Sequence, residues 1–282
     1  MPSFPVIDAH IHLFDRSKVG YGWMREEWPE IDHPHLMPDL DAARGAIEIE
    51  KAVFCEVRPE DGQALAEARF IDAIGEQDAR LAAMTAWAPL HKGRAVEDDL
   101  RDLTGIKRVR GVRYHIPATA DASFDAALLE AVAVLDRFGL HYEIGGPPRG
   151  VAYARGIAER FPEMSIVLVH MGGPDIPGGA FPTWSEEIDA ISKLKNVTVK
   201  VSGTVSFAGK AWKDADVQPY LRHVIDAFGF DRCMYGSDWP ASSFAHAYGD
   251  WVDLIDRTIQ GASLDEQKRF YRDTARRVFR LD

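Results

Sequence analysis

The amino-acid sequence predicts a (β/α)₈ TIM barrel with an extra C-terminal helix. The first observation is that short apolar segments alternate with amphipathic segments of helical period, eight times within 282 residues. Barrels of this kind typically have about 250 residues, so the chain has a suitable length. The second observation is that no glycine-rich phosphate loop follows the first apolar segment, which disfavours a doubly wound open sheet.

Eight short segments, several of them rich in Val and Ile, are expected to form the strands. Such apolar runs are typical of parallel strands that are buried on both faces. They cover residues 5–11, 51–57, 82–87, 109–115, 140–144, 165–170, 196–202 and 232–237. Because the carboxyl ends of all barrel strands open onto one rim, ionisable residues at these ends are expected to meet there.

Amphipathic segments between the strands are expected to form the outer helices, and residues 123–138 give the clearest signals. Ser123 is the expected cap at the start of this helix, and Gly139 is expected to end it. The other helices are expected at residues 39–48, 61–77, 94–103, 149–160, 185–194, 214–228 and 246–259. A last helix covers residues 264–279, where Ser263 and Glu266 form a capping box.

No linker, low-complexity tract or internal repeat divides the chain, so we expect a single domain over residues 1–282. The loop over residues 13–38 is long and holds Tyr21, Trp23 and Trp28. In a barrel this loop lies at the C-terminal rim, where active sites are built. The sequence is equally compatible with a lid over a site and with an aromatic plug packed on the surface.

The formal net charge of −11 argues against nucleic acid or an anionic membrane as a partner, because both require a basic surface. A small-molecule substrate is compatible with this charge, even an anionic one. Cys55 and Cys233 lie inside expected strands and form no disulfide framework, which fits a reducing compartment. With no signal peptide and no long apolar run, a cytoplasmic location is expected. The oligomeric state, including a homo-oligomer, stays open.

Ionisable residues end three of the expected strands. Along the first strand, alternation is expected to place Asp8, His10 and His12 on one face, with the two imidazoles about 6.6 Å apart at the backbone. Neutral imidazole is a common metal ligand, although two histidines at a strand end also fit a purely structural role. His170 ends the sixth strand and Asp238 follows the eighth. Four ionisable groups are therefore expected at one rim.

Four motifs carry a resemblance to a known family. They are Ile7-Asp8-Ala9-His10-Ile11-His12, Val169-His170-Met171-Gly172, Lys200-Val201-Ser202-Gly203 and Tyr235-Gly236-Ser237-Asp238-Trp239-Pro240. Together with the C-terminal segment 274–279, they make nearly the whole chain resemble the amidohydrolase superfamily, in its amidohydrolase-2 group. Within this group the chain is most similar to the lactonases that open sugar lactones and pyrone-dicarboxylate lactones.

The resemblance implies a hydrolase that opens a lactone of a sugar acid, or a related carboxylated lactone, by attack of an activated water. It implies that His10 and His12 bind a divalent metal and that Asp238 takes a proton from the water. His170 is implied to contact the scissile carbonyl or the water. Arg113 and Lys200 are implied to hold the substrate.

Three further expectations come from the strands themselves. His115 shares a strand face with Arg113 and is expected to contact the substrate. The fifth strand lacks the terminal histidine of metal-dependent relatives, and Glu143 is the candidate replacement ligand. The fourth strand lacks a bridging lysine, so we expect one divalent metal such as Zn²⁺, with a metal-free site as the alternative. The alternative function is a metal-dependent nonoxidative decarboxylase of the same barrel family.

Overall fold

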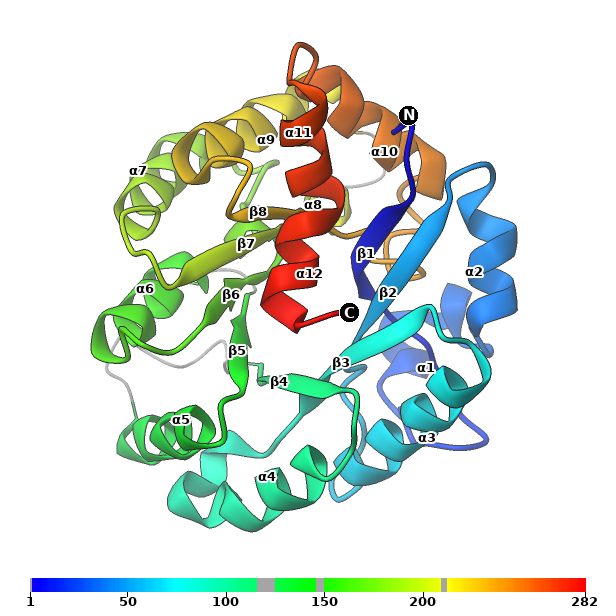
Figure 1. Ribbon diagram of the computed structural model, residues 1–282, viewed down its shortest axis with the longest axis vertical. Helices are drawn as coiled ribbons and strands as arrows, with labels where there is room; N and C mark the ends of the chain where they lie inside the picture. Colours follow the sequence, from blue (N-terminus) through cyan, green and yellow to red (C-terminus); the bar gives the residue numbers. More distant parts are fainter. Residues whose placement is uncertain (1, 116–124, 146–149, 209–211) are drawn as a thin grey trace.

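The computed structural model describes residues 2–115, 125–145, 150–208 and 212–282. The described residues form one sheet of eight parallel strands, which neighbour one another in sequence order (Figure 1). The strands are β1 (Val6–Ile11), β2 (Ile49–Cys55), β3 (Leu81–Trp87), β4 (Val109–Arg113), β5 (His141–Ile144), β6 (Ile166–Leu168), β7 (Val197–Val201) and β8 (Cys233–Tyr235). Each overlaps the strand expected from the sequence, and the predicted barrel is confirmed.

The sheet closes where the loop after β8 pairs with the end of β1. The backbone N–H of His12 donates to the carbonyl of Trp239 (2.7 Å), and that of Asp238 donates to the carbonyl of His10 (2.9 Å). Ile11 and Trp239 form a parallel bridge at the same place. The first and last strands are therefore joined at the carboxyl rim by residues that carry the candidate site.

Helices surround the barrel (Figure 1). The main ones are α2 (Met37–Arg44), α3 (Ala64–Gln77), α4 (Glu97–Thr104), α5 (Ala126–Arg137), α6 (Gly150–Arg160), α7 (Phe181–Ile191), α9 (Asp214–Phe228) and α10 (Tyr248–Thr258). Ser123, the expected cap of α5, lies outside the described residues. Asp125 caps this helix, because its side chain accepts a hydrogen bond from the backbone of Ala127 (3.0 Å). The short helices η2 (Leu90–Val96) and α8 (Thr204–Ala208) precede α4 and α9.

The C-terminal segment crosses the amino end of the barrel, in front of the strands in Figure 1. It consists of α11 (Leu264–Lys268), the π-helical turn η4 (Arg269–Asp273) and α12 (Thr274–Phe279). The predicted capping box is present, since the Ser263 hydroxyl and the Glu266 carboxylate bond to each other's backbone. Phe279 is fully buried and packs with Ile7 and Val53 from inside the barrel. The predicted last helix thus covers the amino end of the barrel interior.

The rim segment 13–38 contains two short helices, α1 (Met24–Glu27) and η1 (Pro29–Ile31). The buried Tyr21 hydroxyl donates to Glu67 on α3 (2.9 Å), and the Trp23 indole donates to the carbonyl of Val57 (3.1 Å). These contacts hold the segment against the barrel. Among the helices that the structure describes, none is both long and apolar enough to cross a bilayer.

Candidate active site

The end of β1 turns two histidines toward the barrel axis. A register shift against β2 follows Asp8. Asp8 points away from the site and accepts hydrogen bonds from the backbone of Ser237 (2.9 Å) and the hydroxyl of Tyr248 (2.8 Å). Beyond the shift, the Nε2 atoms of His10 and His12 approach to 3.2 Å. The expectation that Asp8 shares their face is therefore wrong, because the irregular strand breaks the simple alternation of side chains.

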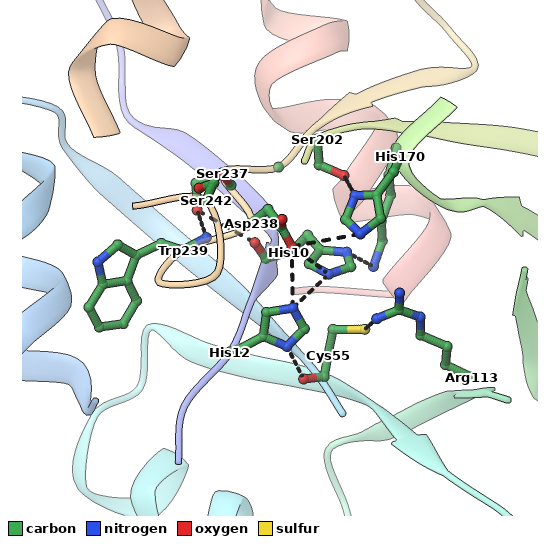
Figure 2. Close-up of polar contacts among 12 residues, drawn as sticks. His10, His12, Cys55, Arg113, His170, Ser202, Ser237, Asp238, Trp239 and Ser242 are labelled. Atoms are coloured by element: carbon green, nitrogen blue, oxygen red, sulfur yellow. Dashed lines mark hydrogen bonds and ion pairs between the residues drawn. The ribbon is translucent and has the colours of Figure 1, made fainter. Parts of the chain in front are cut away.

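The carboxylate of Asp238 lies at the centre of three imidazoles (Figure 2). Its Oδ1 is 3.3 Å from Nε2 of His12, 3.4 Å from Nε2 of His10 and 3.7 Å from Nε2 of His170. All four side chains are buried. The structure thus brings together the four strand-end groups that the sequence singled out.

Left-handed backbone conformations at the ends of β6 and β8 orient the side chains of His170 and Asp238. His170, Met171 and Asp238 have φ values of +53°, +54° and +61°. This conformation is uncommon for residues other than glycine and is found preferentially at functional sites. Gly203, at φ +60°, lies against the His170 ring and the Asp238 carboxylate, so close that a Cβ atom would collide with both. The glycine therefore makes room for the pair.

Hydrogen bonds fix the orientation of the imidazoles. Nδ1 of His12 lies 2.9 Å from the carbonyl oxygen of Cys55, which can only accept. Nδ1 of His12 therefore carries the proton, and its Nε2 lone pair faces Asp238. Nδ1 of His170 bonds to the hydroxyl of Ser202 (2.9 Å). Our sequence reasoning did not single out Ser202, although it lies in the quoted motif after Lys200.

Lys200 and Glu143 form an ion pair in the barrel interior. Both side chains are 0% exposed, and Nζ of Lys200 lies 2.7 and 2.8 Å from the two carboxylate oxygens. Glu143 also accepts from the hydroxyl of Thr85 (2.7 Å), and the His141 ring lies 3.3 Å away. Nζ of Lys200 lies 3.4 Å from Nδ1 of His10. The pair therefore supports His10 from behind, on the side away from Asp238.

Arg113 lies beside the imidazoles, and among the described residues only its Nη1 atom has partners within hydrogen-bond or ion-pair distance. Its Nη1 donates to the sulfur of Cys55 (3.3 Å) and lies 3.7 Å from the carboxylate of Glu56. Nε2 of His115 bonds to the same Glu56 carboxylate (2.9 Å). A guanidinium has five N–H donors, so the contacts with described residues leave donors of Arg113 for a bound molecule.

A cavity of about 460 Å³ opens above these groups. His12, His170, Asp238, Arg113 and Glu56 line its polar side. The opposite wall comes mainly from the rim segment and contains Phe14, Trp23, Met24, Trp28 and Ile31. The side chains of the segment that was expected to be lid or plug thus form an apolar wall. A cavity of this size with one apolar face and convergent polar groups is typical of a small-molecule site.

A comparison with known families decides the assignment. The amidohydrolase family, Amidohydro_2, matches residues 7–281. The chain belongs to this family. The match covers β1 from its second residue, the other seven strands in full and every residue of the candidate site, in agreement with the resemblance carried by the four motifs.

Two named relatives of this amidohydrolase act on lactones. An L-fucono-1,5-lactonase of Burkholderia ambifaria is 27% identical over 87% of this chain and 83% of the relative. A 4-sulfomuconolactone hydrolase of Rhizobium radiobacter is 24% identical over 91% of this chain and 84% of the relative. Among solved structures, an amidohydrolase of Burkholderia multivorans with bound zinc has a TM-score of 0.86 and 25% identity, covering 99% of this chain and all of the other.

Burial determines the protonation of the amidohydrolase site. It lowers the pKa of His170 to about 4, and burial together with the Lys200 charge lowers the pKa of His10 well below its usual value. Both rings are therefore neutral at neutral pH. Burial opposes ionisation of Asp238, but the neighbouring imidazoles of His170 and His12 outweigh it and lower its pKa. Asp238 is thus a carboxylate and can accept a proton.

The donor set around Asp238 can hold a metal ion. A Zn–N bond is about 2.0–2.1 Å, so tetrahedral ligands lie about 3.3 Å apart. The separations among His10, His12, His170 and Asp238 given above match this spacing, and His10, His170 and Asp238 satisfy the geometry of a metal-binding group. His12 presents its lone pair. A ligand role for His10 would place its proton on Nδ1, facing the Lys200 ammonium, which lowers the affinity.

The other predicted residues lie near this group in different ways. Arg113 and His115 line the cavity, as a substrate contact requires. Lys200 and Glu143 lie below it and bond to each other, and neither is among the described residues that line it. The contact of Lys200 with substrate and the ligation of metal by Glu143 stay predictions. Cys55, which forms a second metal-type group with His10 and His12, was not anticipated from the sequence.

Proposed function

We propose that this amidohydrolase opens a lactone of a sugar acid or a related carboxylated lactone. The observation that carries the proposal is the Asp238 carboxylate, held within 3.3–3.7 Å of three imidazoles at the base of a cavity. A buried carboxylate beside open space is suited to remove a proton from water. The two lactone-hydrolysing relatives support the choice of substrate class.

In the proposed reaction, Asp238 accepts a proton while the water oxygen bonds to the lactone carbonyl carbon. The carbonyl oxygen becomes an oxyanion, and Arg113 or a protonated imidazole nitrogen donates to it. The bond from this carbon to the ring oxygen then breaks, and the ring oxygen takes the proton back from Asp238, directly or through His170. The product is a hydroxy acid, which is ionised at neutral pH. Each turnover therefore releases one proton.

A metal ion fits the same arrangement. In this proposal His10 and His12 bind one divalent ion such as Zn²⁺, with Asp238 and His170 in reach of it. When bound, the ion would supply Lewis acidity toward the carbonyl oxygen. Glu143 stays the proposed further ligand, and its carboxylate, which accepts from Lys200 and Thr85, also supports His10 through Lys200.

Arg113 is proposed as the main contact for the substrate. Its buried guanidinium suits a carboxylate, which it can bind with two parallel hydrogen bonds, and it also suits single hydroxyl groups. His115 is held by Glu56, whose pKa is about 2 because His115 and Arg113 outweigh the effect of burial. The apolar wall with Trp23 and Trp28 is proposed to cover one face of the lactone ring.

The location and the partners of the enzyme are proposed from its cysteines and its composition. We propose that it works in the cytoplasm, which the two free, buried cysteines Cys55 and Cys233 support. The acidic composition supports a small molecule as the partner in place of nucleic acid. A homo-oligomer is compatible with the sequence, and the molecular mass in solution decides it.

The test is a proton-release assay in weak buffer, across aldonolactones and dicarboxylate lactones, with mass analysis of the products. Asp238→Asn keeps the size of the side chain and removes the base, so turnover should fall about 10²–10⁴-fold with an unchanged fold. Asp226→Asn changes an exposed carboxylate in the same way and should have no effect. Acid release from no lactone, with loss of carbon dioxide from an unsaturated or aromatic acid, would replace the proposal by the decarboxylase alternative.

A further inference from the structure

A second cavity, which we name the basal pocket, lies at the amino end of the barrel. It has a volume of about 480 Å³ and lies between the starts of β7 and β8 and the C-terminal segment. In Figure 1 this segment crosses in front of the strands, and its turn η4 packs against β8. The active site is built from the carboxyl ends of the same strands, so the two cavities lie at opposite ends of the barrel.

The wall of the basal pocket is positively charged although the chain as a whole is acidic. Four cations line it, namely Lys195, Arg232, Arg269 and Arg277, against the two carboxylates of Asp231 and Asp273. The local excess is two positive charges, whereas the whole chain has a net charge of −11. Such a local excess attracts small anions.

Both carboxylates of the pocket already have partners. Asp231 pairs with Arg269 (3.3 Å), and Asp273 pairs with Arg272 outside the pocket lining (2.8 Å). Arg232 and Arg277 donate to the backbone carbonyls of Leu194 and Asp231, at 2.9 and 2.6 Å. Within the described part of the chain, Lys195, Arg232 and Arg277 have no carboxylate within ion-pair distance. Their charges are therefore available to a ligand.

A buried hydroxyl in the same wall lacks a partner. Thr198 is 6% exposed, lines the basal pocket, and its Oγ1 has no hydrogen-bond partner among the described residues. Val197 and Val199, its neighbours on β7, pack outward against the helices, so Thr198 points inward with Lys200. Leaving such a group unpaired costs about 1–3 kcal/mol. An acceptor atom on a bound molecule would remove this cost.

An irregular helix turn completes the wall. Arg269 and Asp273 are the two ends of the π-helical turn η4, and Thr274, the next residue, also lines the basal pocket. A π-helical turn inserts an extra residue into an α-helix and occurs frequently at functional sites. Here the irregular turn lies directly at the pocket. The packing of α12 against Ile7 and Val53 does not require an irregular turn at this place.

We propose that the basal pocket binds a compact dianion, such as phosphate, a phosphate ester or a small dicarboxylate. The excess of two positive charges matches two negative ones. The Arg and Lys side chains supply donors for oxyanion oxygens, and the Thr198 hydroxyl supplies a donor from below. The ligand is distinct from the lactone, because the pocket lies at the other end of the barrel and contains none of the imidazoles.

The experiment is calorimetric titration of the full chain with inorganic phosphate and, separately, with malonate, at constant ionic strength set by sodium chloride. We expect saturable binding of one equivalent. Lys195→Gln and Arg277→Gln should each weaken binding about threefold to tenfold. Thr198→Val, which keeps the shape of the side chain, should weaken it about twofold to tenfold. The stronger of the two anions identifies the source of the dianion.

The matched control is Lys193→Gln, which removes the same charge from an exposed residue two positions away that does not line the pocket. It should bind phosphate as tightly as the unaltered chain. Three results would overturn the proposal. The first is the absence of saturable binding by either anion. The second is binding that Lys195→Gln, Arg277→Gln and Thr198→Val leave unchanged, since the anion then binds elsewhere. The third is binding that Lys193→Gln weakens equally, since the anion then responds only to overall charge.

Discussion

Replacing Lys200 by methionine tests the buried ion pair beneath the site. Lys200→Met keeps a long unbranched side chain and leaves the carboxylate of Glu143 buried, with hydrogen bonds from Thr85 and His141 but without its cation. Removing one partner of a buried pair typically costs about 3–5 kcal/mol, since the remaining charge is neither solvated nor neutralised. We expect a loss of this size in the free energy of unfolding at neutral pH.

The expected shift in melting temperature follows from the size of the chain. At about 2.1 cal/mol/K per residue, 282 residues give an unfolding entropy of about 0.6 kcal/mol/K. The melting temperature should therefore fall by about 5–8 °C. Burial raises the pKa of a carboxyl group that has lost its cation, so the deficit of Lys200→Met should shrink as the pH is lowered.

The assay is urea unfolding followed by fluorescence, together with a double variant and a surface control. Lys200→Met/Glu143→Gln removes both charges, keeps an acceptor for Thr85, and should recover about 2–3 kcal/mol. Lys92→Met breaks the exposed pair with Asp99 and should cost less than about 1 kcal/mol. A double variant no more stable than Lys200→Met would refute the reasoning, as would a single-variant loss no larger than that of Lys92→Met.

Three further predictions concern the imidazoles and their surroundings. His170 stays neutral in the folded protein down to pH of about 4, whereas it is protonated below about 6.5 when unfolded, so stability is lost as the pH falls through this window. Urea unfolding at pH of about 6.5 and at pH of about 4 measures how much the free energy of unfolding falls between them. This fall should be about 3 kcal/mol larger in the unaltered protein than in His170→Gln, and equal falls would contradict the assignment. Exhaustive chelation should abolish turnover, and one equivalent of Zn²⁺ should restore it; full activity of the chelated protein would select the metal-free alternative. Gly203→Ala should abolish turnover and lower the melting temperature, because its Cβ collides with His170 and Asp238, whereas Gly249→Ala, in open space, should leave turnover unchanged.

The sequence was sufficient for the barrel and for the meeting of the strand-end groups. Apolar runs of strand length define the strands, and in a closed parallel sheet all carboxyl ends must lie at one rim, which brings His10, His170 and Asp238 together. The local conformations could not be derived in this way. The left-handed backbone at His170 and the register shift after Asp8 depend on packing between strands, which the alternation of residues does not encode.

The partners of buried charges were equally inaccessible. Lys200 and Glu143 are 57 positions apart in the chain, and no periodicity predicts that they meet in the barrel interior. Nor could the sequence show that the apolar wall of the cavity comes from the rim segment through Trp23 and Trp28. Both features depend on side-chain directions across the barrel, which follow from the three-dimensional register alone.

The seam between β1 and the loop after β8 makes activity an indicator of complete folding. Asp238 and His12 belong to the bonds that join the first strand to the last, so their functional groups meet only when the ring of strands is shut. An intermediate that has formed the first seven strand–helix units would contain much of the core and no working site. Recovery of turnover during refolding would therefore time the final closure step, separately from the burial of tryptophan.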